Sequence, residues 1–483
     1  MALGSRTAKL YLLSLCVFIL AAPFFAPGGG YGRMTGFKAS LYAVLTTAFL
    51  LVSLLDLRRE KGFFRSPARC LALGYLFFCL LSALCSPWKR EAFLGGSRSE
   101  GFLHLALYAG SFLVLSLRSF PRRGLLCAFT AALGLQGLLC LLQLAGVNAL
   151  GLYPPGLGWA DAGLRYPGAY LGTLGNAGQT GAVLAAGAAL GGLYLLEKGG
   201  RAFLLLPFLA LDAFLLSEMD VTGPMLALCA LLLLAVLPYG KTAGGLCRWG
   251  GLSALTLALI FRKLLGWGGV LGLLLLAGAC FWGERRLPGG KDCRLVSRLL
   301  LGALCLLGLV LTFTYRGWYG PLRDASALLH GQIAEGMGSG RVYIWKEVLR
   351  ALPDRFWLGS GPDTLAFRGL TPYTAWDPAL GREVTLRIDA AHCEYLHTLV
   401  CCGPGAAACH LGLALCAAAG FFRREGAKRI CAGGAFCYAL QALFGISMCA
   451  AAPLFWVLLA LSIHKDGINE EGGADSLAAN EQE

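Results

Sequence analysis

Residues 389–400 read "DAAHCEYLHTLV" and place ionisable side chains directly before an apolar run. Carboxylate and imidazole groups can give or take protons in a reaction, and histidine titrates near neutral pH. Ionisable groups are costly at membrane depth, so they need a reason to be there. The stretch indicates either a site of chemistry or hydrogen-bonding positions at a membrane interface.

The spacing within this stretch separates its members. Glu394 and His397 follow His392 by two and five positions. On a helix, the residues three and four positions away share a face, so Tyr395 and Leu396 lie closest to His392. We therefore interpret Glu394 as a positional or interfacial residue rather than as a catalytic base.

The composition places these groups in a membrane protein. Of the 483 residues, 57% are hydrophobic and 14% are charged, whereas about a quarter of the residues of a soluble protein are charged. The net charge of +14 comes from Lys and Arg clusters between apolar runs. That pattern is typical of membrane topology signals, so the lipid bilayer is an expected partner and nucleic acid is not.

The apolar runs predict an all-α, polytopic integral membrane protein with about 12–14 transmembrane helices. The runs 247–261 and 264–282 are the least secure, and twelve spans remain without them. The predicted spans are 9–27, 39–57, 69–86, 102–118, 124–146, 170–195, 202–217, 223–238, 247–261, 264–282, 295–315, 392–420, 430–446 and 448–464.

Basic residues occur in every second loop between these spans, as the positive-inside rule requires. The rule places both termini in the cytoplasm, and only the pair Arg262–Lys263 falls on the wrong side. The expected regions are N-terminal transmembrane helices (1–315), one large outer loop (316–391), C-terminal transmembrane helices (392–464) and a disordered cytoplasmic tail (465–483).

The predicted outer loop contains "SGRVYIWKEVLRALP" at residues 339–353. Apolar side chains recur there at helical spacing (Val342, Trp345, Leu349, Leu352), which predicts an amphipathic helix over 341–352. Ser339 is the expected N-cap, and Pro353 marks the expected end. Gly359 and Gly361 then predict a turn.

Polar and charged residues gather on the predicted outer face, so we expect a polar outer cleft. They are Arg98, Glu100, Arg165, Asn176, Glu218, Asp220, Arg341, His392 and Glu394. The 19 cysteines show no CxxC pair with partner spacing. We therefore predict neither a metal site nor a disulfide framework and interpret the cysteines as packing residues.

Three stretches, in this order and on this side of the membrane, resemble the O-antigen ligase superfamily, which also contains O-antigen-type polysaccharide polymerases. "GTLGNAGQTGAVLA" (172–185) is similar to a family stretch that opens a span, and it includes Asn176. "SGRVYIWKEVLRALPDRFWLGSGPDTLAF" (339–367) is similar to the outer-loop motif, with Gly340, Arg341 and Trp345. "AHCEYLHTLVCCGPGA" (391–406) is similar to the family's His motif, and Gly403 follows the histidine by eleven positions.

The resemblance implies a glycosyltransferase of the bacterial cytoplasmic membrane that takes a glycan from an undecaprenyl-diphosphate carrier. Arg341 takes the place of a family arginine that contacts the diphosphate, and His392 takes the place of the essential histidine. Both residue types suit these tasks, because arginine offers a planar fork to phosphate oxygens and histidine can accept a hydroxyl proton. Neither a metal nor another cofactor is expected.

This sequence departs from the family pattern at three positions. Cys393 stands where the family has an asparagine, and Ala406 where it has a later glycine. Thr222 stands where the family has an arginine at the outer start of a span. Three readings stay open: another cation supplies the charge, with Arg165 and Arg98 as candidates, or the substrate differs, or catalysis is impaired.

The acceptor is also open, because a ligase transfers to a lipid, protein or other envelope acceptor and a polymerase extends another lipid-linked glycan. A different class, a transporter or flippase of lipid-linked glycan, predicts internal repeats and charges at the membrane midplane. The sequence shows no evident repeat, and its charges favour the outer face. A member of the family that only binds or assembles is a third possibility, because Thr222 replaces the arginine.

Overall fold

The computed structural model describes residues 2–23, 30–55, 63–118, 122–148, 150–153, 171–287, 292–377 and 381–463. A helix lies over each of the fourteen predicted spans, so the all-α prediction is confirmed. In the described part of the chain, nine helices are long and apolar enough to cross a membrane. The fourteen helices are α1 (Ala2–Leu20), α2 (Met34–Leu54), α3 (Pro67–Leu84), α5 (Phe102–Leu115), α6 (Arg122–Leu144), α8 (Ala177–Lys198), α9 (Leu206–Met219), α10 (Thr222–Tyr239), α11 (Ala243–Ile260), α12 (Arg262–Arg286), α13 (Arg294–Thr314), α16 (Glu394–Arg423), α17 (Gly426–Gln441) and α18 (Ala452–Ile463).

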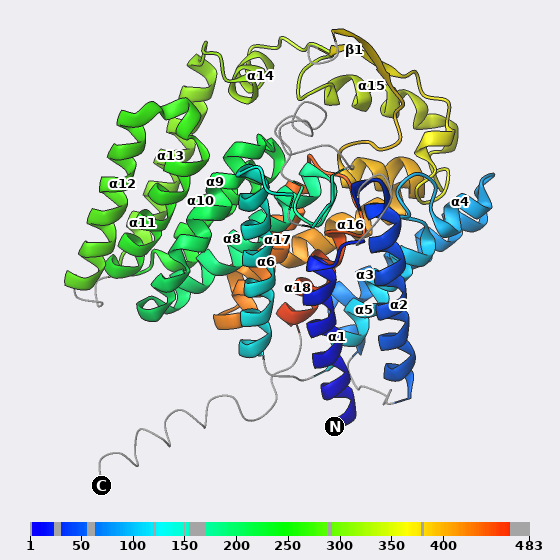
Figure 1. The fold of residues 1–483 in the computed structure, drawn as a ribbon, viewed down its shortest axis with the longest axis horizontal. Coiled ribbons are helices and arrows are strands. Elements are labelled where there is room, and N and C mark those ends of the chain that lie inside the picture. Colours follow the sequence, from blue (N-terminus) through cyan, green and yellow to red (C-terminus); the bar gives the residue numbers. More distant parts are fainter. Residues whose placement is uncertain are drawn as a thin grey trace.

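The smaller elements lie between these helices. Short helices are α4 (Lys89–Leu94), α14 (Gly320–Leu329) and α15 (Arg341–Ala351), and single 3-10 turns occur at 30–33, 63–65, 200–205, 353–355 and 365–367. An antiparallel hairpin, β1 (Tyr373–Asp377) and β2 (Arg382–Leu386), pairs Tyr373 with Leu386. The sequence did not predict this hairpin. Residues 316–391, called the long segment below, thus hold two helices and the hairpin, and they cover the end of the bundle opposite the N-terminus (Figure 1).

The centre of the bundle is α8, which packs against α6, α9, α10 and α17. Its Ala- and Gly-rich surface is almost entirely buried, because small residues let helices approach closely. In contrast, only 6% of the residues in the most apolar part of α12 and of α13 are buried, and apolar side chains cover most sides of both helices. Such helices suit a lipid-facing position at the edge of the bundle.

The basic pair that broke the topology pattern is neutralised locally. Arg262 forms an ion pair with Glu218 of α9, and the Lys263 Nζ donates to the Ser217 carbonyl at 3.0 Å. The Arg262 guanidinium also lies over the Phe214 ring. A charge held by a carboxylate and an aromatic ring costs less at the membrane edge than a free one, so the exception is local.

Helix α16 is broken at Gly403, where φ is +80° and the next residue is Pro404. Proline has no N–H, so the Val400 carbonyl loses its helical partner and accepts a hydrogen bond from Arg368 instead. The Cys401 carbonyl accepts from the Gly361 N–H and from the Ser82 hydroxyl, each at 2.8 Å. Groups from the long segment and from α3 thus satisfy the break.

The predicted glycine turn fits into this break. A Cβ atom at Gly403 would lie 2.1 Å from the Trp357 carbonyl oxygen, and one at Gly359 would lie 2.2 Å from the Cys401 backbone. Both glycines also have positive φ, which other residues rarely adopt. The two backbones therefore touch with no room for a side chain, which fixes the long segment onto α16.

Two details of the α15 prediction are wrong. The N-cap is Gly340 in the left-handed conformation, without a side-chain cap, and not Ser339. The buried face contains Ile344, Glu347 and Val348, whereas Leu349 is 51% exposed. The physical reason is that Glu347 is satisfied when buried, since its carboxylate accepts from Arg350 and from the Thr371 N–H.

The stretch between α17 and α18 also differs from the prediction. Residues 442–451, called the α17–α18 linker below, are not helical, although the predicted spans 430–446 and 448–464 leave one residue between them. Irregular backbone survives at membrane depth only where protein or a wet cavity satisfies it. Polar side chains of distant elements do so here: Gln179 donates to the Ile446 carbonyl and Arg341 to the Phe444 carbonyl.

Replacing Gly403 with alanine tests the backbone contact. We expect Gly403→Ala to lower the free energy of unfolding by about 2 kcal/mol or more, because the new Cβ collides with backbone atoms. Thermal unfolding of the purified protein in detergent measures the loss. The matched control is Gly302→Ala in α13, where a Cβ meets nothing within 4 Å. Equal melting temperatures for the two variants would contradict the contact.

Candidate functional site

A cavity lies under the long segment, where four stretches of the chain converge. They are the loop 95–101, the turn at Pro362–Asp363, residues 387–393 (called the His392 linker below) and the α17–α18 linker. The cavity holds about 730 Å³ of empty space, part of it open to the exterior. Arg98, Glu100, Asp363, His392 and Glu394 all line it.

Asp363 orders the loop that carries Arg98. Its carboxylate accepts hydrogen bonds from the backbone N–H groups of Gly96, Arg98 and Glu100 at 2.8, 2.9 and 3.2 Å, and from the Ser97 hydroxyl. Asp363 is 3% exposed and has a positive φ of 53°. One buried carboxylate therefore connects the long segment to a loop more than two hundred and fifty residues earlier.

The loop directs a cation and an acid into the cavity. Arg98 donates from Nη2 to the Asp389 carboxylate at 2.7 Å, while its Nε–H has no partner. Glu100 accepts from the Tyr108 hydroxyl at 2.6 Å and from the Ser447 hydroxyl at 2.8 Å. Burial raises the pKa of Glu100 to about 7, against the opposing effect of these two hydroxyl groups.

Arg341, in the first turn of α15, does not line the cavity itself but contacts Phe444, which precedes the lining residue Gly445. Gly340 precedes it with φ of +81°, and a Cβ there would collide with the Tyr373 ring. The Arg341 guanidinium donates to the Gly338 carbonyl at 2.7 Å and to the Phe444 carbonyl at 3.1 Å. Its Nε–H has no partner, and burial lowers the pKa of Arg341. Two carbonyl groups thus hold this cation, and no carboxylate among the described residues forms an ion pair with it.

His392 lies beside the two arginines in a constrained backbone. It has a positive φ of 48°, which is uncommon outside glycine and typical of functional positions. The Trp345 indole donates to the Ala391 carbonyl at 2.8 Å, and the Glu394 N–H donates to the Ala442 carbonyl at 2.8 Å. The backbone on both sides of His392 is therefore fixed.

The His392 imidazole itself has no hydrogen bond to the part of the chain that the structure describes. Burial, followed by the positive charges of Arg341 and Arg98, lowers its pKa to about 4. The Asp389 carboxylate acts in the opposite direction, but less strongly. In the empty cavity, the ring is thus neutral at physiological pH and able to accept a proton.

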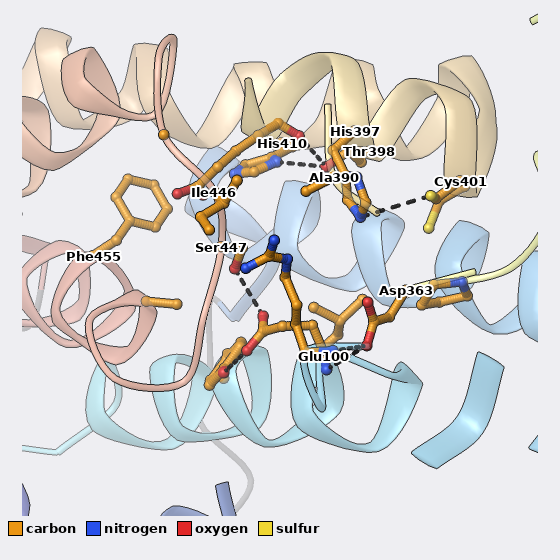
Figure 2. Close-up of a pocket in the computed structure, with 18 of the residues that line it drawn as sticks. Glu100, Asp363, Ala390, His397, Thr398, Cys401, His410, Ile446, Ser447 and Phe455 are labelled. Carbon is orange, nitrogen blue, oxygen red and sulfur yellow. Dashed lines mark hydrogen bonds between the residues drawn. The ribbon is translucent and has the colours of Figure 1, made fainter. Parts of the chain in front are cut away.

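The inner wall of the cavity is formed by hydrogen-bonded pairs (Figure 2). Figure 2 shows Ser447 with Glu100 on one side and Thr398 with His410 on the other. Glu394 is 4% exposed and accepts from the Tyr438 hydroxyl at 3.1 Å. Its contacts suit the positional role that we inferred from the spacing, since it joins the start of α16 to α17.

The other residues singled out by sequence take different places. Asn176 caps α8 by accepting from the Gln179 N–H at 3.1 Å, so it acts on the helix and not on the cavity. Gly403 forms the kink in α16 described above. Arg165 lies outside the described residues. Thr222 begins α10 next to Gly223, whose Cα faces Phe444, so the missing arginine would have lain near Arg341.

Sequence reasoning missed several members of the site. Asp363 followed the predicted glycine turn, but nothing in its neighbourhood pointed to the loop 95–101. Asp389 appeared only as the first letter of the polar stretch, without a partner. Ser447 was the single residue between the predicted spans 430–446 and 448–464, and nothing in the apolar sequence around it pointed to a polar contact.

A comparison with family models identifies the residues around the site. Residues 263–411 match the family described as O-Antigen ligase. The match identifies an O-antigen ligase domain in this part of the chain. The matched part runs from α12 into α16 and contains Arg341, Trp345, His392 and Gly403, whereas Arg98 and Asn176 lie before it. No curated protein matches the sequence.

A domain of this family implies an enzyme of the glycosyl-transfer type, and the apolar helices imply a multi-pass membrane protein. It also implies a lipid-linked glycan and an acceptor as substrates. The Arg98 guanidinium and the His392 imidazole line the cavity, and the charge of Arg341 lies close enough to His392 to lower its pKa.

Removing the Asp363 carboxylate tests how the loop 95–101 is held. We expect Asp363→Ala to lower the free energy of unfolding by about 3 kcal/mol, because three buried N–H groups lose a charged acceptor. Asp363→Asn keeps one acceptor oxygen and the same backbone conformation. Its free energy of unfolding should therefore lie between those of the wild type and of Asp363→Ala. Thermal unfolding in detergent measures both. Asp354→Ala is the control, with a carboxylate that is 78% exposed in the same segment, and melting of Asp363→Ala like this control would contradict the role.

Proposed function

We propose that the protein transfers a glycan from an undecaprenyl-diphosphate carrier to an acceptor hydroxyl on the outer face of the bacterial cytoplasmic membrane. The observation that carries the proposal is the convergence of Arg341, Arg98 and His392 beside one cavity. The O-antigen ligase match supports it for the segment that contains Arg341 and His392.

In the proposed reaction, His392 accepts the proton of the acceptor hydroxyl as that oxygen bonds to the anomeric carbon. The bond between the anomeric carbon and the diphosphate oxygen breaks, and its electron pair leaves with the diphosphate. A general base of this kind contributes about 10²–10⁴-fold to a rate. The new charge on the leaving group falls next to Arg341 and Arg98, which are already in place before the reaction.

In this proposal, Arg98 supplies the positive charge that is missing because Thr222 stands where the family has an arginine. Its guanidinium lies in the cavity with an Nε–H that has no partner. A diphosphate oxygen would satisfy that donor and the free Nε–H of Arg341. The second cation then comes from the loop 95–101, outside the matched part, and not from the start of α10.

The acceptor decides between ligase and polymerase, which share this chemistry. We favour a ligase, and the length pattern of the surface polysaccharide in a deletion strain separates the two. Loss of long chains with single repeats still attached indicates a polymerase. Loss of all attached glycan, with lipid-linked glycan accumulating, indicates a ligase.

His392 and Arg341 are the two residues that should act directly on the substrates. In a deletion strain, His392→Ala and Arg341→Ala should each leave lipid-linked glycan accumulating, with transfer reduced at least about 100-fold. Quantified lipid-linked glycan and membrane levels of each variant measure this. His330→Ala and Arg323→Ala are the controls: both residues are in the long segment, neither lines the cavity, and, unlike Arg341, neither is among the charges that act on His392. Normal transfer by His392→Ala would refute the catalytic role.

The pH dependence of kcat/KM for the donor tests the state of His392. Because kcat/KM reports the free enzyme, and burial with two nearby arginines lowers the pKa of His392 to about 4, His392 should remain an unprotonated base down to that value. We expect kcat/KM for the donor to stay flat as the pH falls from about 7.5 to about 5.5. Initial rates at low donor concentration give the profile, and an acidic limb near the ordinary histidine value would contradict it.

A further inference from the structure

The His392 imidazole lacks the orienting partner that a general base usually has. Bases of this type are held by a third group, which fixes the ring and stabilises its protonated form. In the described chain, no side chain hydrogen-bonds to the His392 ring, while the backbone on both sides of it is fixed by Trp345 and Ala442. The ring is therefore placed in the cavity but not oriented.

Several charged and titratable groups face this ring. Arg341 of α15, Arg98 of the loop 95–101, Asp389 of the His392 linker and His397 of α16 act on it most directly. Glu100, Asp363 and Glu394 share the cavity wall, but hydroxyl or backbone groups already occupy their carboxylates. Asp389 lies three positions before His392, and unlike the other three acids it is not buried, because its side chain is 30% exposed.

Asp389 is paired with Arg98 and not with His392 in this structure. Its Oδ1 accepts from Arg98 Nη2 at 2.7 Å. The two arginines nevertheless each keep one buried N–H without an acceptor. A diphosphate carries more negative charge than a carboxylate and can engage a guanidinium through two oxygens, so it competes well for Arg98.

We propose that Asp389 is the positioning residue of His392: the donor diphosphate takes over Arg98, and the released Asp389 carboxylate accepts a hydrogen bond from the His392 ring. One ring nitrogen then donates to Asp389, and the other accepts the proton of the acceptor hydroxyl. Donor binding is thereby coupled to the orientation of the base, because the His392 ring is oriented only when a donor is present.

The geometry of the linker permits this exchange. The Ala391 carbonyl is held by Trp345, and Arg387 is held by the Ala366 carbonyl, so the backbone stays in place on both sides of Asp389. Only the Asp389 side chain needs to turn, and it is partly exposed. The diphosphate also neutralises the two cations that disfavour protonation of His392. The exchange therefore strengthens the base at the moment when it is needed.

The proposal rests on the proposed function, and its kinetic test uses Asp389→Asn in the purified full-length protein with a lipid-linked donor. We expect kcat to fall at least about tenfold, and the acidic limb of the kcat profile to move to lower pH, because a carboxylate no longer stabilises the protonated ring. The donor KM should not rise, since a competitor for Arg98 has been removed. Asp389→Glu should restore part of kcat, and Asp354→Asn should resemble the wild type.

The opposite pattern would overturn the proposal. If Asp389 only holds Arg98 in place, Asp389→Asn raises the donor KM and leaves kcat and its pH profile unchanged. Absence of donor turnover by the wild type would instead refute the proposed function.

A binding measurement tests the Asp389–His392 contact without turnover. In protein labelled with ¹³C-histidine and assigned with His392→Gln, undecaprenyl diphosphate should raise the pKa of His392 in the wild type and raise it less in Asp389→Asn. Equal shifts in the two proteins, or none in either, would overturn the contact. The kinetic and binding readouts therefore separate failure of the contact from failure of the glycosyl-transfer function.

Discussion

The contact between the Gly359 turn and the break in α16 at Gly403 is the constraint on which the site depends. Two backbones meet there with no space for a side chain, and the freed carbonyl of Cys401 is satisfied by Gly361 and Ser82. The turn continues directly into Asp363, which holds the loop 95–101. A helix break that would be costly in lipid thus becomes the point that fixes the cavity wall.

The arrangement of charge follows from that constraint. The cations Arg98 and Arg341 lie at the cavity with unpaired N–H groups, while the acids below them are buried and hydrogen-bonded. An anion bound near both arginines would accept hydrogen bonds from these N–H groups, whereas a bound cation would be repelled by them. Fixed dipoles and charges of this kind stabilise a developing negative charge without having to reorganise. Burial, followed by the charges of these two arginines, also lowers the pKa of the His392 ring.

The sequence predicted what depends on local pattern. The hydropathy of each span predicted a helix that is present, and the apolar spacing in 341–352 predicted the existence of α15. Gly359 and Gly403 lie in the turn and in the break of α16. The pairs that build the cavity were not predictable, because Arg98 and Asp389 are 291 positions apart and Glu100 and Ser447 are 347 apart. The α17–α18 linker was missed for the same reason: its own residues look helical, and its hydrogen-bond partners are remote Gln179 and Arg341. Ser339 was a reasonable cap by type, but a left-handed glycine met the need for close approach to Tyr373.

The central claim is that the diphosphate of a lipid-linked glycan binds between Arg341 and Arg98, next to His392. An electron cryo-microscopy structure of the protein with undecaprenyl diphosphate in a lipid nanodisc tests it most directly. The account predicts phosphate density within hydrogen-bond distance of both guanidinium groups, with the Asp389 carboxylate turned from Arg98 toward His392. Diphosphate density elsewhere, for example beside Arg262 and Lys263 with the cavity empty, would contradict it.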